Sequence, residues 1–256
     1  MSVKNNPIGV IDSGVGGISV LKEAVKQLPY ENFIYYGDSK NAPYGIKSVD
    51  EVRNLTFNVV EKLLKLNIKA LVVACNTATS AAIDELREKY KNIPVIGIEP
   101  ALKPAVELKR RGKIIIMATP MTLSEVKFKN LMEKYEKDSE IVKLPCPGLV
   151  ELIEDGIVEG EKMQEYLRNK FKDYEKDDIA AFVLGCTHYP FVKKEIASIA
   201  RDVPIIDGSQ GTVMQLKRKL DKYDILNIGS EKGKIKIMNS LKDDKILDLS
   251  HRLLDL

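Results

Sequence analysis

Short runs of apolar residues alternate with amphipathic helical segments along most of this 256-residue chain. Continuous apolar runs, as at 8–11 and 71–74, are typical of strands buried on both faces. Segments such as 49–66 instead repeat their apolar residues at helical spacing. Because an alternation of strands and helices returns each strand parallel to the last, we expect an α/β fold with mainly parallel, doubly wound sheets.

The two halves of the chain resemble each other in the order of their features. The first strand of one half ends at Asp12, and the first strand of the other half ends at Thr119. A later strand in each half leads to a cysteine, Cys75 or Cys186, followed by small polar residues. We interpret this pattern as a weak internal duplication that produces two pseudo-symmetric lobes.

The expected lobe boundaries follow from where the alternation restarts. Residues 1–98 form the first lobe and residues 99–207 the second, while residues 208–256 fold back onto the first lobe. In this tail we expect a helix, a strand at 224–228 and a last helix after Met238. We expect the ligand in the cleft between the lobes, at the C-terminal ends of the strands.

The composition excludes several other classes of protein. With 44% hydrophobic and 30% charged residues the chain is globular, and its net charge of +3 gives no concentrated basic face for nucleic acid. No apolar run reaches the roughly 18 residues of a membrane span, and the N-terminus lacks the apolar region of a signal peptide. Three cysteines argue against a disulfide framework. We expect a cytoplasmic protein with reduced thiols and no nucleic-acid or membrane partner.

Two other site types fit the sequence poorly. A dinucleotide fingerprint requires a third glycine after Gly14 and Gly16, but Ser19 occupies that position. The chain has only two histidines, and the spacing of Cys186 and His188 gives no zinc-like ligand set. We therefore expect neither a nucleotide cofactor nor a metal.

The two cysteines at strand ends indicate acid–base chemistry. We expect each cysteine to lie where a strand ends and a helix begins. A thiolate is stabilised at a helix N-terminus, and the same N–H groups can bind a carboxylate. A single buried cysteine is often structural, but two in equivalent settings favour a functional pair. Cys146, between two prolines, is interpreted as structural. The residues expected to add hydrogen bonds beside the two thiols are Asn76, Thr77, Thr187 and His188.

Four blocks of sequence resemble one known family. They are 12–17 (DSGVGG), 38–45 (DSKNAPYG), 74–78 (ACNTA) and 185–190 (GCTHYP). In this order they are similar to the glutamate racemase family, which belongs to the cofactor-independent aspartate/glutamate racemases. The resemblance runs from about residue 8 to residue 207. It implies glutamate as a small-molecule substrate, no cofactor, and a homodimer. It further implies supply of D-glutamate for peptidoglycan, and thus a role in cell-wall biogenesis and cell shape.

The resemblance also implies roles for individual residues. Cys75 is expected to act on D-glutamate and Cys186 on L-glutamate. Asp12 is expected to assist Cys75, while His188, together with Glu154, assists Cys186. The residues implied to bind substrate are Asp12, Ser13, Pro43, Tyr44, Gly45, Asn76, Thr77, Thr119, Thr122, Thr187 and His188.

Two alternatives remain open at this point. One is a racemase of aspartate or another acidic amino acid, although His188 favours glutamate because aspartate racemases tend to carry Glu at this position. The other is a non-catalytic protein that binds acidic metabolites and whose thiols are structural or redox-responsive.

Overall fold

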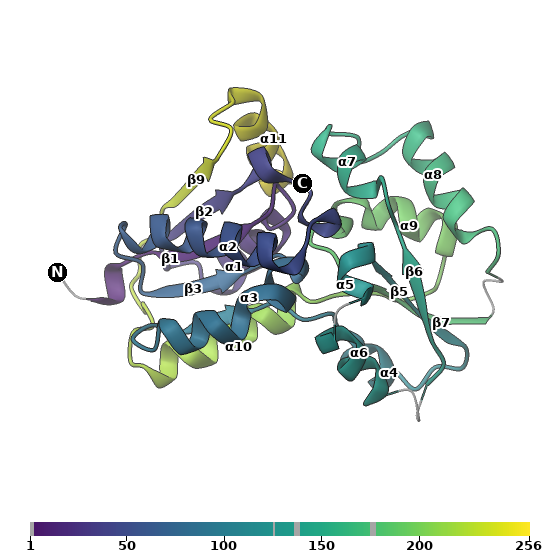
Figure 1. Ribbon diagram of the computed structural model, residues 1–256, viewed down its shortest axis with the longest axis horizontal. Coiled ribbons are helices and arrows are strands. Elements are labelled where there is room, and N and C mark those ends of the chain that lie inside the picture. The colour runs from purple at the N-terminus through teal and green to yellow at the C-terminus, as the bar shows by residue number, and fades with distance from the viewer. Residues whose placement is uncertain (1–2, 125, 136–138, 175–177) are drawn as a thin grey trace. The chain divides into compact units, whose positions relative to one another are not determined.

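The computed structural model describes residues 3–124, 126–135, 139–174 and 178–256 (Figure 1). The chain divides into two compact units, the first formed by Met1–Glu99 with Ser209–Leu256 and the second by Pro100–Gly208. Each unit contains its own parallel sheet. The predicted α/β class, with parallel sheets in two lobes, is confirmed.

The first unit is built on a five-stranded sheet in the order β4-β3-β1-β2-β9. Every neighbouring pair is parallel. Strands β1 to β3 are buried along their whole length, which explains their continuous apolar sequences. The strands are β1 (Ile8–Asp12), β2 (Phe33–Gly37), β3 (Ala70–Val73), β4 (Val95–Gly97) and β9 (Ile235–Asn239).

Helices cover the sheet of the first unit, with α1 packing against α10 and α11, and α2 against α3. Local sequence signals start two of them, because the side chains of Ser48 and Asp243 cap the first turns of α2 and α11. The helices are α1 (Ile18–Gln27), α2 (Val49–Leu64), α3 (Asn76–Lys89), α10 (Ser209–Lys222) and α11 (Asp244–Asp255). Short 3₁₀ turns are η1 (Val3–Asn5), η2 (Ser39–Asn41) and η3 (Tyr44–Ile46).

The strand predicted at 224–228 is wrong, and the strand of this tail is β9. A buried ion pair explains the difference: Lys69 Nζ lies 2.5 Å from Glu31 Oε2, with both side chains almost fully buried. Lys69 donates to the carbonyl of Ile225, and the backbone N–H of Asn227 donates to Glu31. The backbone of this segment therefore bonds to side chains instead of to a neighbouring strand.

The second unit contains a four-stranded parallel sheet in the order β6-β5-β7-β8. Alternate residues of β7 enter different cores, with Phe182 on one face and Val183 on the other. Both faces are thus covered, as a parallel sheet requires. The strands are β5 (Lys113–Ala118), β6 (Ile141–Pro145), β7 (Ile179–Leu184) and β8 (Ile205–Asp207).

The helices of the second unit are α4 (Leu102–Glu107), α5 (Pro120–Ser124), α6 (Val126–Glu133), α7 (Leu149–Glu154), α8 (Glu161–Phe171) and α9 (Lys193–Ala200), with the 3₁₀ turn η5 (Tyr189–Val192). The helix predicted from about Thr122 corresponds to α5 and α6, and residue 125 lies outside the described residues. Within the described part of the chain, no helix is both long enough and apolar enough to cross a membrane.

Candidate active site

Three strands of the first unit end side by side and present polar side chains at one edge of the sheet. Asp12 is the last residue of β1 and pairs with Gly37, the last residue of β2. The N–H of Asp38 then donates to the Asp12 carbonyl at 3.0 Å, and Ala74 N–H donates to Ile11 at 2.8 Å. The register therefore brings Asp12, Asp38 and the Cys75 segment to the same C-terminal edge, where ligands bind in open α/β sheets.

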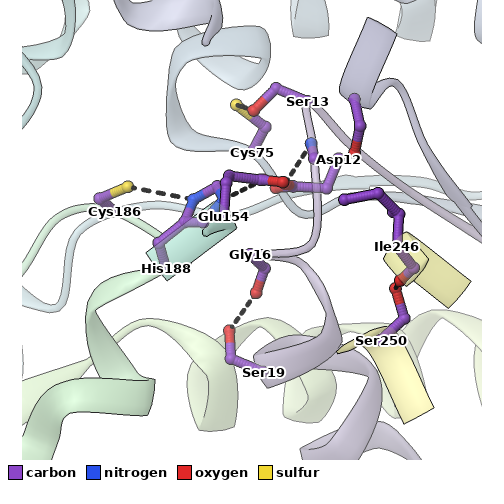
Figure 2. Close-up of polar contacts among 12 residues, drawn as sticks. Asp12, Ser13, Gly16, Ser19, Cys75, Glu154, Cys186, His188, Ile246 and Ser250 are labelled. Atoms are coloured by element: carbon purple, nitrogen blue, oxygen red, sulfur yellow. Dashed lines mark hydrogen bonds and ion pairs between the residues drawn. The ribbon is translucent and has the colours of Figure 1, made fainter. Parts of the chain in front are cut away.

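Cys75 caps the N-terminus of α3 with its sulfur. The N–H of Ala78 donates to Cys75 Sγ at 3.4 Å, and Ser13 Oγ lies 3.7 Å from the same sulfur (Figure 2). The thiol is 5% exposed. A helix N-terminus and a backbone donor both favour the thiolate over the thiol, so this sulfur is suited to accept a proton.

Asp12 organises the glycine-rich loop that carries Ser13. Its carboxylate Oδ1 accepts the N–H of Gly14 at 3.0 Å, and the hydroxyl of Tyr35 donates to the Gly14 carbonyl at 2.6 Å. The loop lies so close to β2 that a Cβ on Gly37 would be 2.5 Å from the Gly14 carbonyl oxygen. Ser13 is thus held beside Cys75 by contacts on both of its flanks.

The loop at 39–46 is held in place by Asp38, the buried residue that directly precedes it. Asp38 Oδ2 accepts the hydroxyl of Tyr44 at 2.7 Å and the side-chain amide of Asn41 at 2.9 Å. Burial, together with the negative charge of Asp38, raises the pKa of Tyr44 far above its usual value. Tyr44 therefore remains a protonated donor, and its neighbours Pro43 and Gly45 are carried in the same loop. Asp38 was not among the predicted site residues, although its position at a strand end and within a family block was the available signal.

Asn76 is the first residue of α3 and is 5% exposed. Its side-chain oxygen has no hydrogen-bond partner among the described residues. An unsatisfied buried acceptor is rare because it costs free energy. The oxygen is therefore suited to accept a hydrogen bond from a ligand, and Thr77, also buried, follows it directly.

The second unit repeats the arrangement at the ends of its central strands β5 and β7. Thr119 directly follows β5. Gly185 follows β7, and its N–H donates to the carbonyl of Met117 in β5 at 2.7 Å, so the next residue, Cys186, lies near the C-terminal end of β5. The hydroxyls of Thr119 and Thr122 are 3.0 Å apart, and both residues are buried, as is Thr187.

The His188 ring lies between Cys186 and Glu154 (Figure 2). Its Nδ1 is 3.7 Å from Cys186 Sγ, and its Nε2 is 2.6 Å from Glu154 Oε1 at the end of α7. Burial acts to lower the pKa of His188, but hydrogen bonds to Cys186 and Glu154 and their negative charges outweigh it, so this pKa is well above its ordinary value. A protonated imidazole beside a sulfur stabilises the thiolate and can carry a proton.

The helix N-terminus predicted directly behind each thiol is found only at Cys75. After Cys186 the chain forms the 3₁₀ turn η5, which contains Pro190, and α9 begins only at Lys193. A proline is favoured at the start of a helical turn because it has no N–H to donate. The prediction is wrong for Cys186, where the imidazole of His188 provides the positive charge instead.

Cys146 lacks comparable neighbours, consistent with a structural role. Its thiol is buried, donates to the carbonyl of Leu144 at 3.4 Å, and has its pKa raised by burial to about 12. Among the described residues, no three His, Cys, Asp or Glu side chains are grouped to hold a metal.

Comparisons with known proteins identify the relatives of this chain. The family model for Asp/Glu/hydantoin racemases matches residues 8–216. Glutamate racemases from Clostridium botulinum (strain Alaska E43) and Clostridium novyi are 60% and 61% identical, covering 100% and 99% of this chain and 99% of each relative. The crystal structure of Francisella tularensis glutamate racemase in complex with D-glutamate has a TM-score of 0.85 at 30% identity. The match covers 99% of this chain and 95% of the Francisella tularensis chain.

A further crystal structure, of a glutamate racemase isoform from Bacillus anthracis, has a TM-score of 0.88 at 32% identity and covers 99% of this chain and 95% of its own. The two parallel sheets, together with these relatives, define an α/β isomerase. The chain belongs to the Asp/Glu/hydantoin racemase family. The family membership predicted from the four sequence blocks is confirmed.

Proposed function

We propose that this chain is a glutamate racemase that interconverts L- and D-glutamate with Cys75 and Cys186 as its two acid–base groups. The observation that carries the proposal is the repeated geometry at the strand ends. Each thiol is buried and has its own polar support, Ser13 and a helix N-terminus for Cys75, and His188 with Glu154 for Cys186. The identity of at least 60% to relatives named glutamate racemase supports glutamate as the substrate.

In the proposed reaction one proton is removed from the α carbon, and another is added to the opposite face of that carbon. With L-glutamate, the thiolate of Cys186 takes the Cα proton, forming an S–H bond, and the C–H electron pair delocalises into the α-carboxylate. The thiol of Cys75 then gives its proton to the opposite face of the carbon, which produces D-glutamate and leaves Cys75 as the thiolate. The reverse reaction uses the same steps with the two sulfurs exchanged.

The proposed binding groups match the charges of glutamate. The buried, unsatisfied oxygen of Asn76 is an acceptor for the substrate ammonium. Donors for the carboxylates and for the enolate-like charge are provided by Ser13, the loop of Tyr44, and the threonine hydroxyls. The residues assigned to substrate binding are Asp12, Ser13, Pro43, Tyr44, Gly45, Asn76, Thr77, Thr119, Thr122, Thr187 and His188.

The test is exchange of the Cα hydrogen in deuterium oxide without added cofactor. We expect L-glutamate and D-glutamate both to incorporate deuterium with inversion, and L-aspartate to exchange much more slowly. Faster exchange with aspartate would change the substrate assignment. Binding of glutamate without any exchange would instead support a non-catalytic binding protein.

We further propose that the chain acts in the cytoplasm as a homodimer and supplies D-glutamate for peptidoglycan. Expression in a bacterium that requires external D-glutamate tests this role, since growth without D-glutamate is the expected result. Growth with wild type and not with Cys75→Ala would assign the effect to racemisation. Sedimentation of the purified protein tests the dimer.

A further inference from the structure

Two residues of the C-terminal segment hold the loop that carries Tyr44. The side-chain amide of Asn239 donates to Ser39 Oγ at 2.8 Å. The N–H of Lys40 donates to Ser240 Oγ at 2.9 Å. The two partners in each bond are 200 residues apart in the sequence. No local sequence pattern links them.

The backbone of the sheet places these two residues at the loop. Strand β9 lies beside β2 (Figure 1). Asn239 is opposite Gly37, and Ser240 N–H donates to the Gly37 carbonyl at 2.9 Å. Asn239 is buried, and its Oδ1 accepts the N–H of Leu241 at 2.9 Å, so its amide group is directed by two bonds. Donor and acceptor are therefore presented to the loop in a fixed orientation.

We propose that Asn239 and Ser240, named here the C-terminal clasp, are positioning residues for substrate binding. The clasp holds the first turn of the loop, η2, from the C-terminal segment. Asp38, which directly precedes this turn, binds the side chains of Asn41 and Tyr44. With both ends of the turn bound, the loop presents Tyr44 in one conformation. The proposal rests on the proposed function, in which this loop contacts glutamate.

The clasp touches no reacting atom, so its effect is on the population of the binding-competent loop. When that population falls, the apparent affinity for a ligand falls by the same factor. Loss of one neutral hydrogen bond lowers the equilibrium constant for the binding-competent loop by roughly two- to tenfold. We therefore expect loss of a clasp bond to raise KM for glutamate and to change kcat much less.

The experiment compares Ser240→Ala with the conservative variant Ser240→Thr, which keeps the hydroxyl. Ser230→Ala, at an exposed serine of the same segment, is the matched control. We expect KM to rise roughly two- to tenfold in Ser240→Ala and to stay near wild type in the other two variants. Ser39→Ala removes the acceptor of the Asn239 bond from the loop side and should raise KM without altering the C-terminal segment.

Amide hydrogen exchange provides a readout that does not require activity. In Ser240→Ala, exchange at 39–46 should become faster, with the Lys40 N–H most affected, and in Ser240→Thr it should remain slow. Unchanged exchange and unchanged KM in Ser240→Ala would overturn the proposal. A lower kcat and a lower unfolding midpoint with KM unchanged would also overturn it, because that result describes a purely structural contact.

The two proposals fail in distinguishable ways. If the wild-type protein shows no Cα exchange with glutamate, the proposed function fails, while amide exchange still measures whether the clasp holds the loop. If racemisation is present and only the loop measurements are unchanged, the clasp alone is rejected.

Discussion

The two thiols have different polar neighbours. In the first unit Cys75 caps an α-helix, receives a backbone N–H from Ala78, and lies beside the neutral hydroxyl of Ser13. In the second unit Cys186 lies beside the imidazole of His188, which is bound to Glu154. In the proposed mechanism, a symmetric reaction on two mirror-image substrates therefore uses two chemically different sites. The comparison predicts which substitutions should matter at each site.

The largest expected effect comes from removing either sulfur. Cys75→Ala and Cys186→Ala should each lower racemisation by about a thousandfold or more, because general acid–base groups contribute factors of this order. Polarimetry with glutamate measures the loss. Cys146→Ala is the control, and it should retain racemisation within a few-fold even if removal of its buried sulfur lowers stability. Full activity of either Cys75→Ala or Cys186→Ala would exclude the two-thiol mechanism.

The next effect concerns the charged support of Cys186. His188→Asn should lower kcat/KM by about a hundredfold, and Glu154→Gln by about tenfold, since Glu154 acts on the sulfur only through the imidazole. The two enantiomers have equal free energies, so kcat/KM must fall by the same factor in both directions. His251→Asn, at an exposed position, is the matched control. Equal losses in His188→Asn and His251→Asn would show that the imidazole beside Cys186 has no special role.

The protonation of His188 gives a third, smaller effect. Its pKa is raised by contacts with Cys186 and Glu154, so the contacts stabilise the fold fully below the unfolded pKa of about 6.5 and lose that stabilisation as pH rises through the higher folded value. Glu154→Gln removes one of the two partners and should lower the pKa of His188. In a His251→Gln background only one histidine remains, and NMR of its ring measures the pKa directly.

Urea unfolding provides the matching stability measurement. The wild type should lose more of its free energy of unfolding than Glu154→Gln when pH is raised from about 6 through the folded pKa of His188. If both proteins have the same His188 pKa and the same pH dependence of stability, Glu154 does not support the imidazolium.

Most of the fold could be predicted because each buried strand appears in the sequence as a short, continuous apolar run. The runs at 8–11, 71–74 and 114–118 are apolar throughout, as strands covered on both faces must be. The strand in the tail, residues 208–256, was not predicted correctly. The backbone at 225 and 227 is bound by Lys69 and Glu31, and the sequence of the tail does not show such distant partners.

The candidate site could be predicted to the same extent. Cysteines at the ends of apolar strands indicated both thiols, and the family resemblance indicated His188 and Glu154. The clasp of Asn239 and Ser240 could not be found, because it depends on which strand occupies the edge beside β2. The resemblance assigns Asp12 to assist Cys75, and the structure adds the hydroxyl of Ser13, which lies 3.7 Å from the sulfur.

The smallest expected effect sharpens the assignment at Cys75. Ser13→Ala removes a neutral hydroxyl from the sulfur and should lower kcat/KM by roughly two- to tenfold, in line with the loss of one neutral hydrogen bond. Ser19→Ala is the matched control, because Ser19 lies in the same segment and its hydroxyl donates to the Gly16 carbonyl at 2.8 Å (Figure 2). It should cost about 1 kcal/mol of stability without raising KM. If Ser13→Ala instead approaches the loss seen in His188→Asn, the hydroxyl acts in proton transfer and the two sites are more alike than their neighbours indicate. If Ser13→Ala has no effect, the hydroxyl of Ser13 does not support Cys75.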